Sequence, residues 1–246
     1  MKRFLIGLLF LCSVPCFAGN FGNATQPWTL AQIRYQVRLD IRDSTSTVNI
    51  NFDFLDPDLN TRINAAQDYI CRNTKCLYAT ISTTPIAGQR EYLLPADCWA
   101  IDRVVFTGSG IPRLKGRTIA GLDKEISSWW KVSPGTPLYY YRRENNIGLY
   151  PAPSQSCITN STGTIIIDYF QRPAPMLLDT DMPFNGDTAL QDYANIIIEM
   201  TDIMCLDTMN ETNAEISQRL SVDLPNMKAW SLFRYSNDLS ENVQLN

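Results

Sequence analysis

Residues 89–106, with the sequence QREYLLPADCWAIDRVVF, constrain the possible fold more than any other stretch of the chain. Tyr92 and its neighbours are good strand formers, but Pro95 lacks the amide hydrogen that a sheet ladder needs. The first strand must therefore end at Pro95 or lie at a sheet edge, and residues 96–98 turn the corner. The chain then resumes in extended form over residues 100–106. This stretch predicts a β-corner inside a mixed fold, and it carries no catalytic pattern.

Two helices are predicted before this stretch. Thr29 and Gln32 form a capping box, in which each side chain satisfies a backbone amide of the other, at the start of a helix over residues 30–42. Asp56 is expected to cap a second helix, which carries a proline in its first turn. Between the two helices, residues 47–54 alternate apolar and polar side chains, which predicts a short strand or an extended arm.

Helical spacing of apolar residues returns near the C-terminus. Asp187 is expected to cap one helix, and a second capping box, formed by Thr212 and Glu215, opens another. Pro225 removes an amide and its ring clashes with the preceding turn, so it is expected to end or kink this helix. The polar residues 236–246 are expected to form a loose tail.

Strand patterns fill the middle of the chain. Besides the two strands of the corner, the expected strands are residues 78–83, 138–143, 147–150 and 164–170. Residues 85–88 carry turn signals, so the strand at 78–83 is expected to form a hairpin with the first strand of the corner. Asp123 is expected to cap a short helical turn that carries Trp129 and Trp130.

The order of helices, strands and helices predicts an α+β fold. The terminal helices are expected to pack together as a helical bundle, with the strands forming an inserted antiparallel β-sheet domain. The expected division is an apolar leader at residues 1–19, N-terminal helices at 20–76, the β insertion at 77–182, C-terminal helices at 183–235 and a polar tail at 236–246.

Composition narrows the classes of function. The chain has no histidine among its 246 residues, which excludes Ser-His-Asp and Cys-His nucleophiles and histidine general bases. It shows no phosphate loop, nucleophile or metal-ligand pattern, so the sequence predicts no enzyme activity, no cofactor and no metal. A formal charge of −4 argues against a protein that grips nucleic acid phosphates, because that task needs a clustered basic surface.

The first 19 residues are typical of a secretion signal. Lys2 and Arg3 precede an apolar run at residues 4–12, Pro15 breaks that run, and small residues follow where a signal peptidase would cut. The alternative is an amphiphilic segment that stays in the mature protein and is buried in an assembly.

The cysteines do not settle the compartment. Five of them lie outside the leader, and an odd number excludes a complete disulfide framework in the processed monomer. Cys71 and Cys76 could pair, but scattered buried thiols are the favoured interpretation.

Several short motifs recur in an order that resembles a known family. They are RINAAQ at 62–67, EYLLPAD at 91–97, IDRV at 101–104, GTPLY at 135–139, IGLYPAP at 147–153, and DY at 168–169 followed by RP at 172–173. In this order and spacing they resemble tailed-bacteriophage head-to-tail connector (adaptor) proteins of the tail tubular protein A type.

The resemblance implies a structural virion protein. In that family a ring, expected here to hold twelve copies, joins the portal protein to a tail or nozzle protein and lengthens the DNA channel. DNA would pass without sequence-specific binding, and the acidic balance fits a wall along which DNA slides. Such a protein assembles in the host cytoplasm and resides in the neck or tail of the virion, with no membrane in the mature assembly. The leader is then unexplained.

Two sets of residues are candidates for assembly contacts. They are Arg34, Arg38 and Arg42 on the first helix, and Trp230, Phe233 and Tyr235 near the C-terminus. The arginines stand one turn apart and could face acidic groups of a neighbouring subunit, although a solvated helix face is the alternative. The aromatic residues are of the kind that anchors interfaces. The resemblance makes the portal their partner, because the C-terminal segment engages it in that family.

A secreted or periplasmic binding protein is the competing hypothesis. The leader supports it, and the β domain could recognise a protein ligand or a carbohydrate, which Trp129, Trp130 and the tyrosines at 139–141 would stack against. The favoured interpretation of the tyrosines, however, is alternating core and edge positions of a hairpin. A carboxylate-using hydrolase is the third possibility, but no pair of carboxylates stands out as acid and base.

Overall fold

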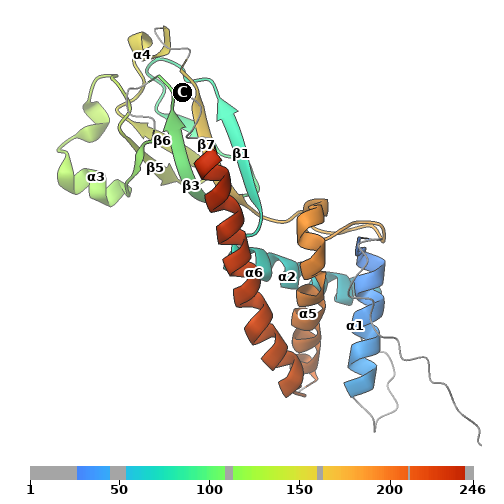
Figure 1. Cartoon of the computed structure of the whole chain (residues 1–246). Coiled ribbons are helices and arrows are strands. Elements are labelled where there is room, and N and C mark those ends of the chain that lie inside the picture. The colour runs from blue at the N-terminus through green and yellow to red at the C-terminus, as the bar shows by residue number, and fades with distance from the viewer. Residues whose placement is uncertain (1–26, 45–53, 109–112, 160–162, 210, 242–246) are drawn as a thin grey trace, which may run out of the picture.

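The computed structural model describes residues 27–44, 54–108, 113–159, 163–209 and 211–241, without the side chains of 42–44 and 236–241. Figure 1 shows an elongated molecule with a helical bundle at one end and a β domain at the other. The terminal helices pack together while the strands between them form a separate unit, which confirms the predicted α+β class. The expected strand at residues 47–54 falls almost wholly outside the described residues.

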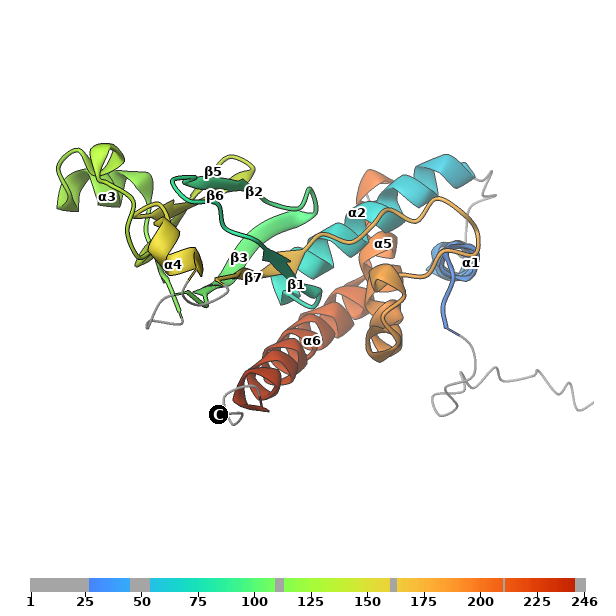
Figure 2. The same ribbon diagram turned by 90° about the horizontal axis from the view of Figure 1, so that it is seen from above.

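Four helices form the bundle. They are α1 (Leu30–Ser44), α2 (Asp56–Thr74), α5 (Ala194–Thr208) and α6 (Ala214–Glu241). Helix α5 lies between α1 and α6 (Figure 1), and α2 crosses the bundle and packs on all three (Figure 2). Their apolar faces, with Ile33, Ile63 and Ile197 fully buried, share one core. Two 3-10 turns, Phe184–Gly186 and Thr188–Tyr193, lead into α5.

The β domain holds two sheets. The first has the order β1 (Tyr78–Thr83), β7 (Ile165–Gln171), β3 (Cys98–Phe106), and the second has the order β2 (Glu91–Leu93), β6 (Asn146–Tyr150), β5 (Tyr139–Arg143), β4 (Lys115–Gly116). Strand pairing is antiparallel except between β4 and β5, which run parallel. The connections carry α3 (Ile119–Glu125), a 3-10 turn (Trp129–Lys131) and α4 (Gln155–Thr159).

The corner at Pro95 moves the chain from one sheet to the other. Strand β2 before the corner belongs to the second sheet and β3 after it belongs to the first, so the predicted order of strand, corner and strand is confirmed. The Asp97 carboxylate fixes the corner to β7, because it accepts hydrogen bonds from Gln171 Nε2 at 2.6 Å and from the Tyr169 hydroxyl at 3.3 Å. Burial, together with the Asp97 charge, raises the pKa of Tyr169 to about 12.

The predicted hairpin between residues 78–83 and the corner is wrong. Strand β1 pairs with β7, with Ile81 opposite Ile167, whereas β2 pairs with β6. Strand β7 carries three consecutive isoleucines and takes the central place in its sheet, where both of its edges are covered. Strand partners are chosen by burial across the whole domain, which turn signals do not encode.

Tyr141 crosses the second sheet above Gly148. Gly148 on β6 lies opposite Tyr141 of β5 on one side and opposite Glu91 of β2 on the other. The Tyr141 hydroxyl donates to Glu91 Oε1 at 3.1 Å, so the ring reaches from β5 across β6 to β2. The Tyr141 ring also makes an edge-to-face contact with Trp129, with ring centroids 5.1 Å apart. A side chain at position 148 would collide with this ring.

Three helix caps differ from the prediction. Leu55, not Asp56, occupies the cap position of α2 without a side-chain hydrogen bond, and the Asp56 carboxylate pairs with Arg34 and Arg38 instead. Thr118 caps α3 by accepting an amide of the first turn at 3.0 Å, while Asp123 accepts instead from the Trp129 indole at 2.8 Å. Asn213 caps α6, accepting two amides at 3.0 and 3.2 Å, in place of the expected Thr212. At α6 the adjacent residue supplies the capping oxygen in place of Thr212. The turn that Asp123 was expected to cap, Trp129–Lys131, follows Ser128 and has no side-chain cap bond.

Helix α6 continues through Pro225, so the expected end of the helix there is wrong. Pro225 is exposed. The carbonyl of Ser221, four residues earlier, therefore loses its amide partner on the solvent side, where water can replace it at moderate cost. The helix reaches Glu241, past residue 236, where a loose tail was expected.

The cysteines described in the structure form no disulfide with one another, and four of the five are buried. Cys71 and Cys76 lie with their sulfur atoms 3.5 Å apart at the C-terminal end of α2, too far for a bond. Buried thiols are therefore the correct interpretation.

Candidate assembly interface

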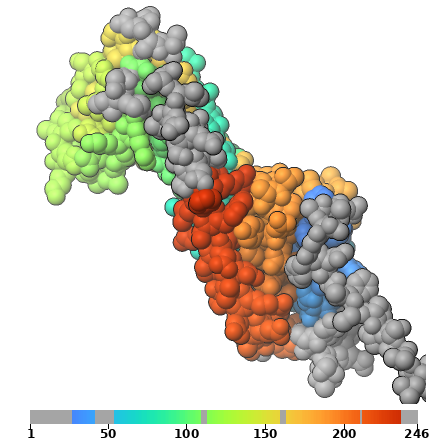
Figure 3. Space-filling view, in the orientation of Figure 1, coloured from blue at the N-terminus to red at the C-terminus, as the bar shows by residue number. Residues whose placement is uncertain are grey.

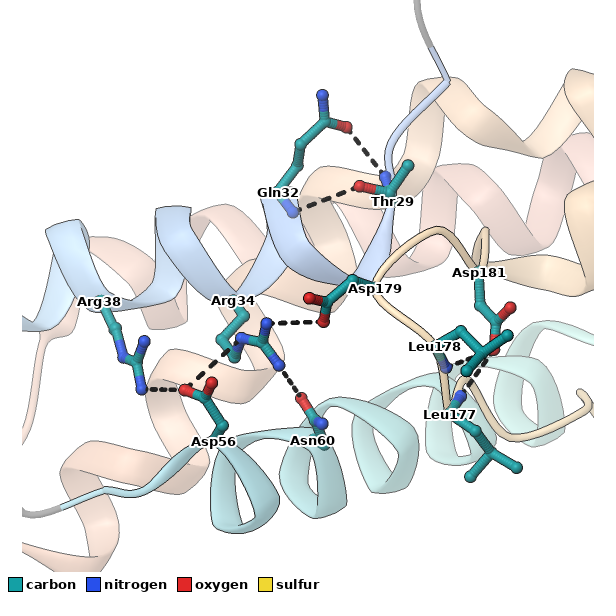
Figure 4. A network of polar contacts seen from close by, with 10 residues as sticks. All are labelled: Thr29, Gln32, Arg34, Arg38, Asp56, Asn60, Leu177, Leu178, Asp179 and Asp181. Atoms are coloured by element: carbon teal, nitrogen blue, oxygen red, sulfur yellow. Dashed lines mark hydrogen bonds and ion pairs between the residues drawn. The ribbon is translucent and has the colours of Figure 1, made fainter.

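Arg34 ties three segments of the bundle together (Figure 4). Its guanidinium donates to Asn60 Oδ1 of α2 at 3.1 Å and to Asp179 Oδ1, in the connection before α5, at 2.7 Å. Its Nε also lies 3.7 Å from Asp56 Oδ1 at the start of α2. Arg34 is only 9% exposed. The solvated helix face is therefore wrong for Arg34, whose charge is used within the chain.

Arg38 shares the carboxylate of Asp56 with Arg34 (Figure 4), and its side chain is 31% exposed. Arg42 belongs to α1, but its side chain lies outside the described residues. The helical spacing predicted the common stripe of the first two arginines. It did not indicate that Asp179, 145 residues after Arg34, supplies the strongest contact. A role of the arginines between subunits stays a prediction.

Two polar residues of the 62–67 motif hold the connection between β7 and α5. Asn64 donates to the carbonyl of Met176 at 3.0 Å and accepts its amide at 2.7 Å. Gln67 donates to the carbonyl of Ala174 at 3.2 Å and accepts the amide of Phe184 at 2.8 Å. The sequence analysis used this motif for the family resemblance and did not predict that its two carboxamides dock an extended segment onto α2.

This connection presents two leucines to solvent. The Asp181 carboxylate accepts the amides of Leu177 and Leu178 at 2.7 and 2.8 Å (Figure 4), and these bonds lower the pKa of Asp181. The two leucines are 75% and 66% exposed. The turn is therefore a well-ordered apolar projection beside α1 and α2.

Two of the three predicted C-terminal anchors face their own chain. Trp230 packs against Tyr193, with ring centroids 5.5 Å apart. Tyr235 stacks on Tyr78 of β1 at 4.7 Å, and its hydroxyl donates to the carbonyl of Cys76. These contacts attach the outer half of α6 to the junction of the bundle and the β domain.

The third predicted anchor, Phe233, belongs to an exposed apolar stripe of α6. Val222, Leu232 and Phe233 are 55%, 54% and 65% exposed, and they lie on the side of the helix turned away from the fully buried Met227. Exposed Pro225 and Ala229 continue the stripe between them. Sequence reasoning missed Val222 and Leu232, although their spacing from Phe233 is a signal for this face. Figure 3 shows α6 along the outside of the bundle, reaching towards the β domain.

Two of the aromatic residues suggested for a carbohydrate platform lie in the core of the β domain. Trp129 and Tyr141 are 7% and 1% exposed and pack on each other, and Trp129 also packs on Tyr150. Burial and the nearby Glu91 charge raise the pKa of Tyr141 to about 12. Trp130, in contrast to Trp129 and Tyr141, is half exposed. In the tyrosine run Tyr141 is a core position, while Tyr139 and Tyr140 are partly buried against different clusters of the β domain.

Within the described ranges, no three His, Cys, Asp or Glu side chains are grouped as metal ligands would be. The same ranges hold no helix of the length and apolarity that a membrane crossing requires.

Residues 28–221 match the family model for the SU10 adaptor protein. The chain belongs to this adaptor family. Its members are structural adaptors of phages, so the chain is a structural virion component and its family is not a class of enzymes. A search of curated proteins found no match. The match to the adaptor family covers α1, α2, the β domain, α5 and the start of α6, and it ends before the outer half of α6.

Proposed function

We propose that the chain is a ring subunit, of the tail tubular protein A type, that joins the portal to the tail and extends the DNA channel. The match to the adaptor family over residues 28–221 carries this proposal. We further propose that twelve copies form the ring in the host cytoplasm, that a tail or nozzle protein binds its far side, and that the chain catalyses no reaction. The net charge of −4 supports a channel wall that does not retain DNA.

The exposed stripe of α6 is the surface that we assign to the portal contact. Its large apolar members are Val222, Leu232 and Phe233. Large apolar residues in one cluster are better anchors than scattered ones, because interface energy concentrates in few side chains. Phe233 was one of the anchors predicted from the sequence, and Leu232 now accompanies it.

Trp230 and Tyr235 contribute differently. Because both rings pack within the chain, they position the outer half of α6 rather than face the portal. The ring contacts between subunits remain assigned to α1, where Arg38 is partly exposed and Arg42 follows one turn later.

A truncation at Ser221 would not test the portal contact cleanly. It would remove Met227 and Ser231, which are fully buried, and the stacked ring of Tyr235. Loss of binding could then follow from loss of the bundle.

The clean test changes only exposed side chains. We expect the double variant Leu232→Asp and Phe233→Asp to fold normally but to lose binding to the portal ring of the same phage by at least about a hundredfold, because two desolvated anchors are each worth about 2 kcal/mol. The double variant Gln218→Asp and Ser221→Asp adds the same charge to exposed positions of the same helix. It should bind like the wild type.

Electron microscopy of the portal mixed with each protein shows whether a collar forms. Circular dichroism of each variant shows whether it is folded. A collar formed by the Leu232 and Phe233 variant would refute the docking surface. A wild-type chain that forms no collar on its own portal would refute the adaptor ring itself.

A further inference from the structure

Two carboxyl groups are buried one turn apart on α5, the helix that lies between α1 and α6 (Figure 1). Glu199 and Asp202 are 7% and 2% exposed. Glu199 Oε1 lies 3.5 Å from Arg219 Nε of α6, but Glu199 Oε2 and Asp202 Oδ1 have no hydrogen-bond partner among the described residues. Buried polar atoms are almost always hydrogen-bonded, so these two oxygens need an explanation.

The surrounding charges do not neutralise the pair. Asp40 of α1 and Asp223 of α6 add negative charge, and Arg219 is the cation that acts on both carboxyl groups. On α2, the guanidinium of Arg62 is taken up by the carbonyl of Met204, to which it donates at 2.7 Å. Arg219 itself is half exposed, which weakens its attraction. Two ionised carboxylates at this place would be costly, and binding a proton removes one charge.

We propose that Glu199 and Asp202 form a proton-binding site that is occupied at neutral pH and that strengthens the packing of α5 against α1 and α6. Burial, followed by the charges of Asp40 and Glu199, raises the pKa of Asp202 to about 8. Burial also raises the pKa of Glu199. The two groups titrate as one coupled pair, and loss of the proton places two negative charges in the bundle. This proposal concerns the folded chain alone and does not depend on the portal.

The sign of the pH effect follows from the two states. An aspartate in the unfolded chain loses its proton near pH about 3.9. Between that pH and about 8 the folded chain holds a proton that the unfolded chain lacks, so stability falls as pH rises through this range. The chain has no histidine, so few other side chains titrate between pH 5.5 and 7.5.

The test is urea unfolding of the full chain at pH 5.5 and pH 7.5. One proton changes the unfolding constant by at most about tenfold per pH unit, so we expect the wild-type constant to rise by about 10- to 100-fold between the two conditions. Asp202→Asn should abolish most of this rise, because its side chain is neutral throughout, and should be more stable than the wild type at pH 7.5. Asp207→Asn, on the exposed side of the same helix, is the matched control and should keep the wild-type rise.

A wild-type constant that changes less than about threefold overturns the proposal. The proposal is also overturned if the unfolding constant of Asp202→Asn rises between pH 5.5 and pH 7.5 as much as that of the wild type. If Asp202→Asn does not fold, Glu199→Gln decides in its place. If the unfolding constant of Glu199→Gln rises with pH as much as that of the wild type, the coupled pair is excluded. A smaller rise supports it.

Discussion

Replacing Gly148 by alanine is expected to lower the free energy of unfolding by about 3 kcal/mol or more. The added Cβ would lie 2.0 Å from the nearest atom of the Tyr141 ring, far inside van der Waals contact. The ring has no room to retreat, because it is 99% buried, rests against Trp129 and is tethered to Glu91 through its hydroxyl. The substitution must therefore break the Tyr141–Glu91 bond or open the second sheet.

Gly135→Ala is the matched control for this prediction. Its Cβ would meet Pro151 at 3.7 Å, which is an ordinary contact, and we expect a change below about 1 kcal/mol. Urea unfolding of both variants, with near-ultraviolet circular dichroism as a probe of the aromatic cluster, measures the difference. Equal stability of the two variants would show that the Tyr141 ring does not pack tightly on Gly148.

Replacing Arg34 by methionine is expected to cost about 2 to 3 kcal/mol. Methionine keeps the apolar stem but removes the bonds to Asn60 and Asp179 and the ion pair with Asp56. The cost stays below that of a fully buried ion pair, because the side chains of Asp179 and Asp56 are 69% and 50% exposed and can be solvated.

Arg38→Met is the matched control, since it removes a partly exposed guanidinium from the same carboxylate one turn away. We expect it to cost less than about 1 kcal/mol. Chemical denaturation gives both values, and hydrogen exchange shows whether the connection between β7 and α5 opens in Arg34→Met. Similar costs for the two variants would contradict the assignment of Arg34 as the tie between α1, α2 and this connection.

The two arginines also show how the interpretation of the assembly contacts changes. The sequence placed both on one stripe and left an interface or a solvated face as the choices. In the folded chain Arg34 is an internal tie, whereas Arg38 is partly exposed beside Asp56 and Val222, Leu232 and Phe233 of α6 are exposed. The aromatic residues near the C-terminus divide in the same way, because Trp230 and Tyr235 are internal and Phe233 is exposed.

Features that depend on neighbouring residues were predictable from the sequence. The capping box of Thr29 and Gln32 forms as expected, with bonds of 3.0 and 3.4 Å, because its geometry involves a single helical turn. The turn between β5 and β6 was predictable for the same reason. The corner at Pro95 follows from one missing amide. The α+β class follows from the order in which helical and alternating patterns succeed each other.

Only the tertiary structure decided which distant groups meet. The pairing of β1 with β7, the bond from Arg34 to Asp179 and the burial of Asp202 each join segments that are far apart along the chain or depend on several helices at once. Such contacts are selected by burial and charge compensation in the complete core, and no local propensity encodes them. The sequence by itself determined the order of helices and strands, the corner and the family resemblance, whereas packing decided which arginines, aromatic rings and carboxyl groups are buried and which are exposed.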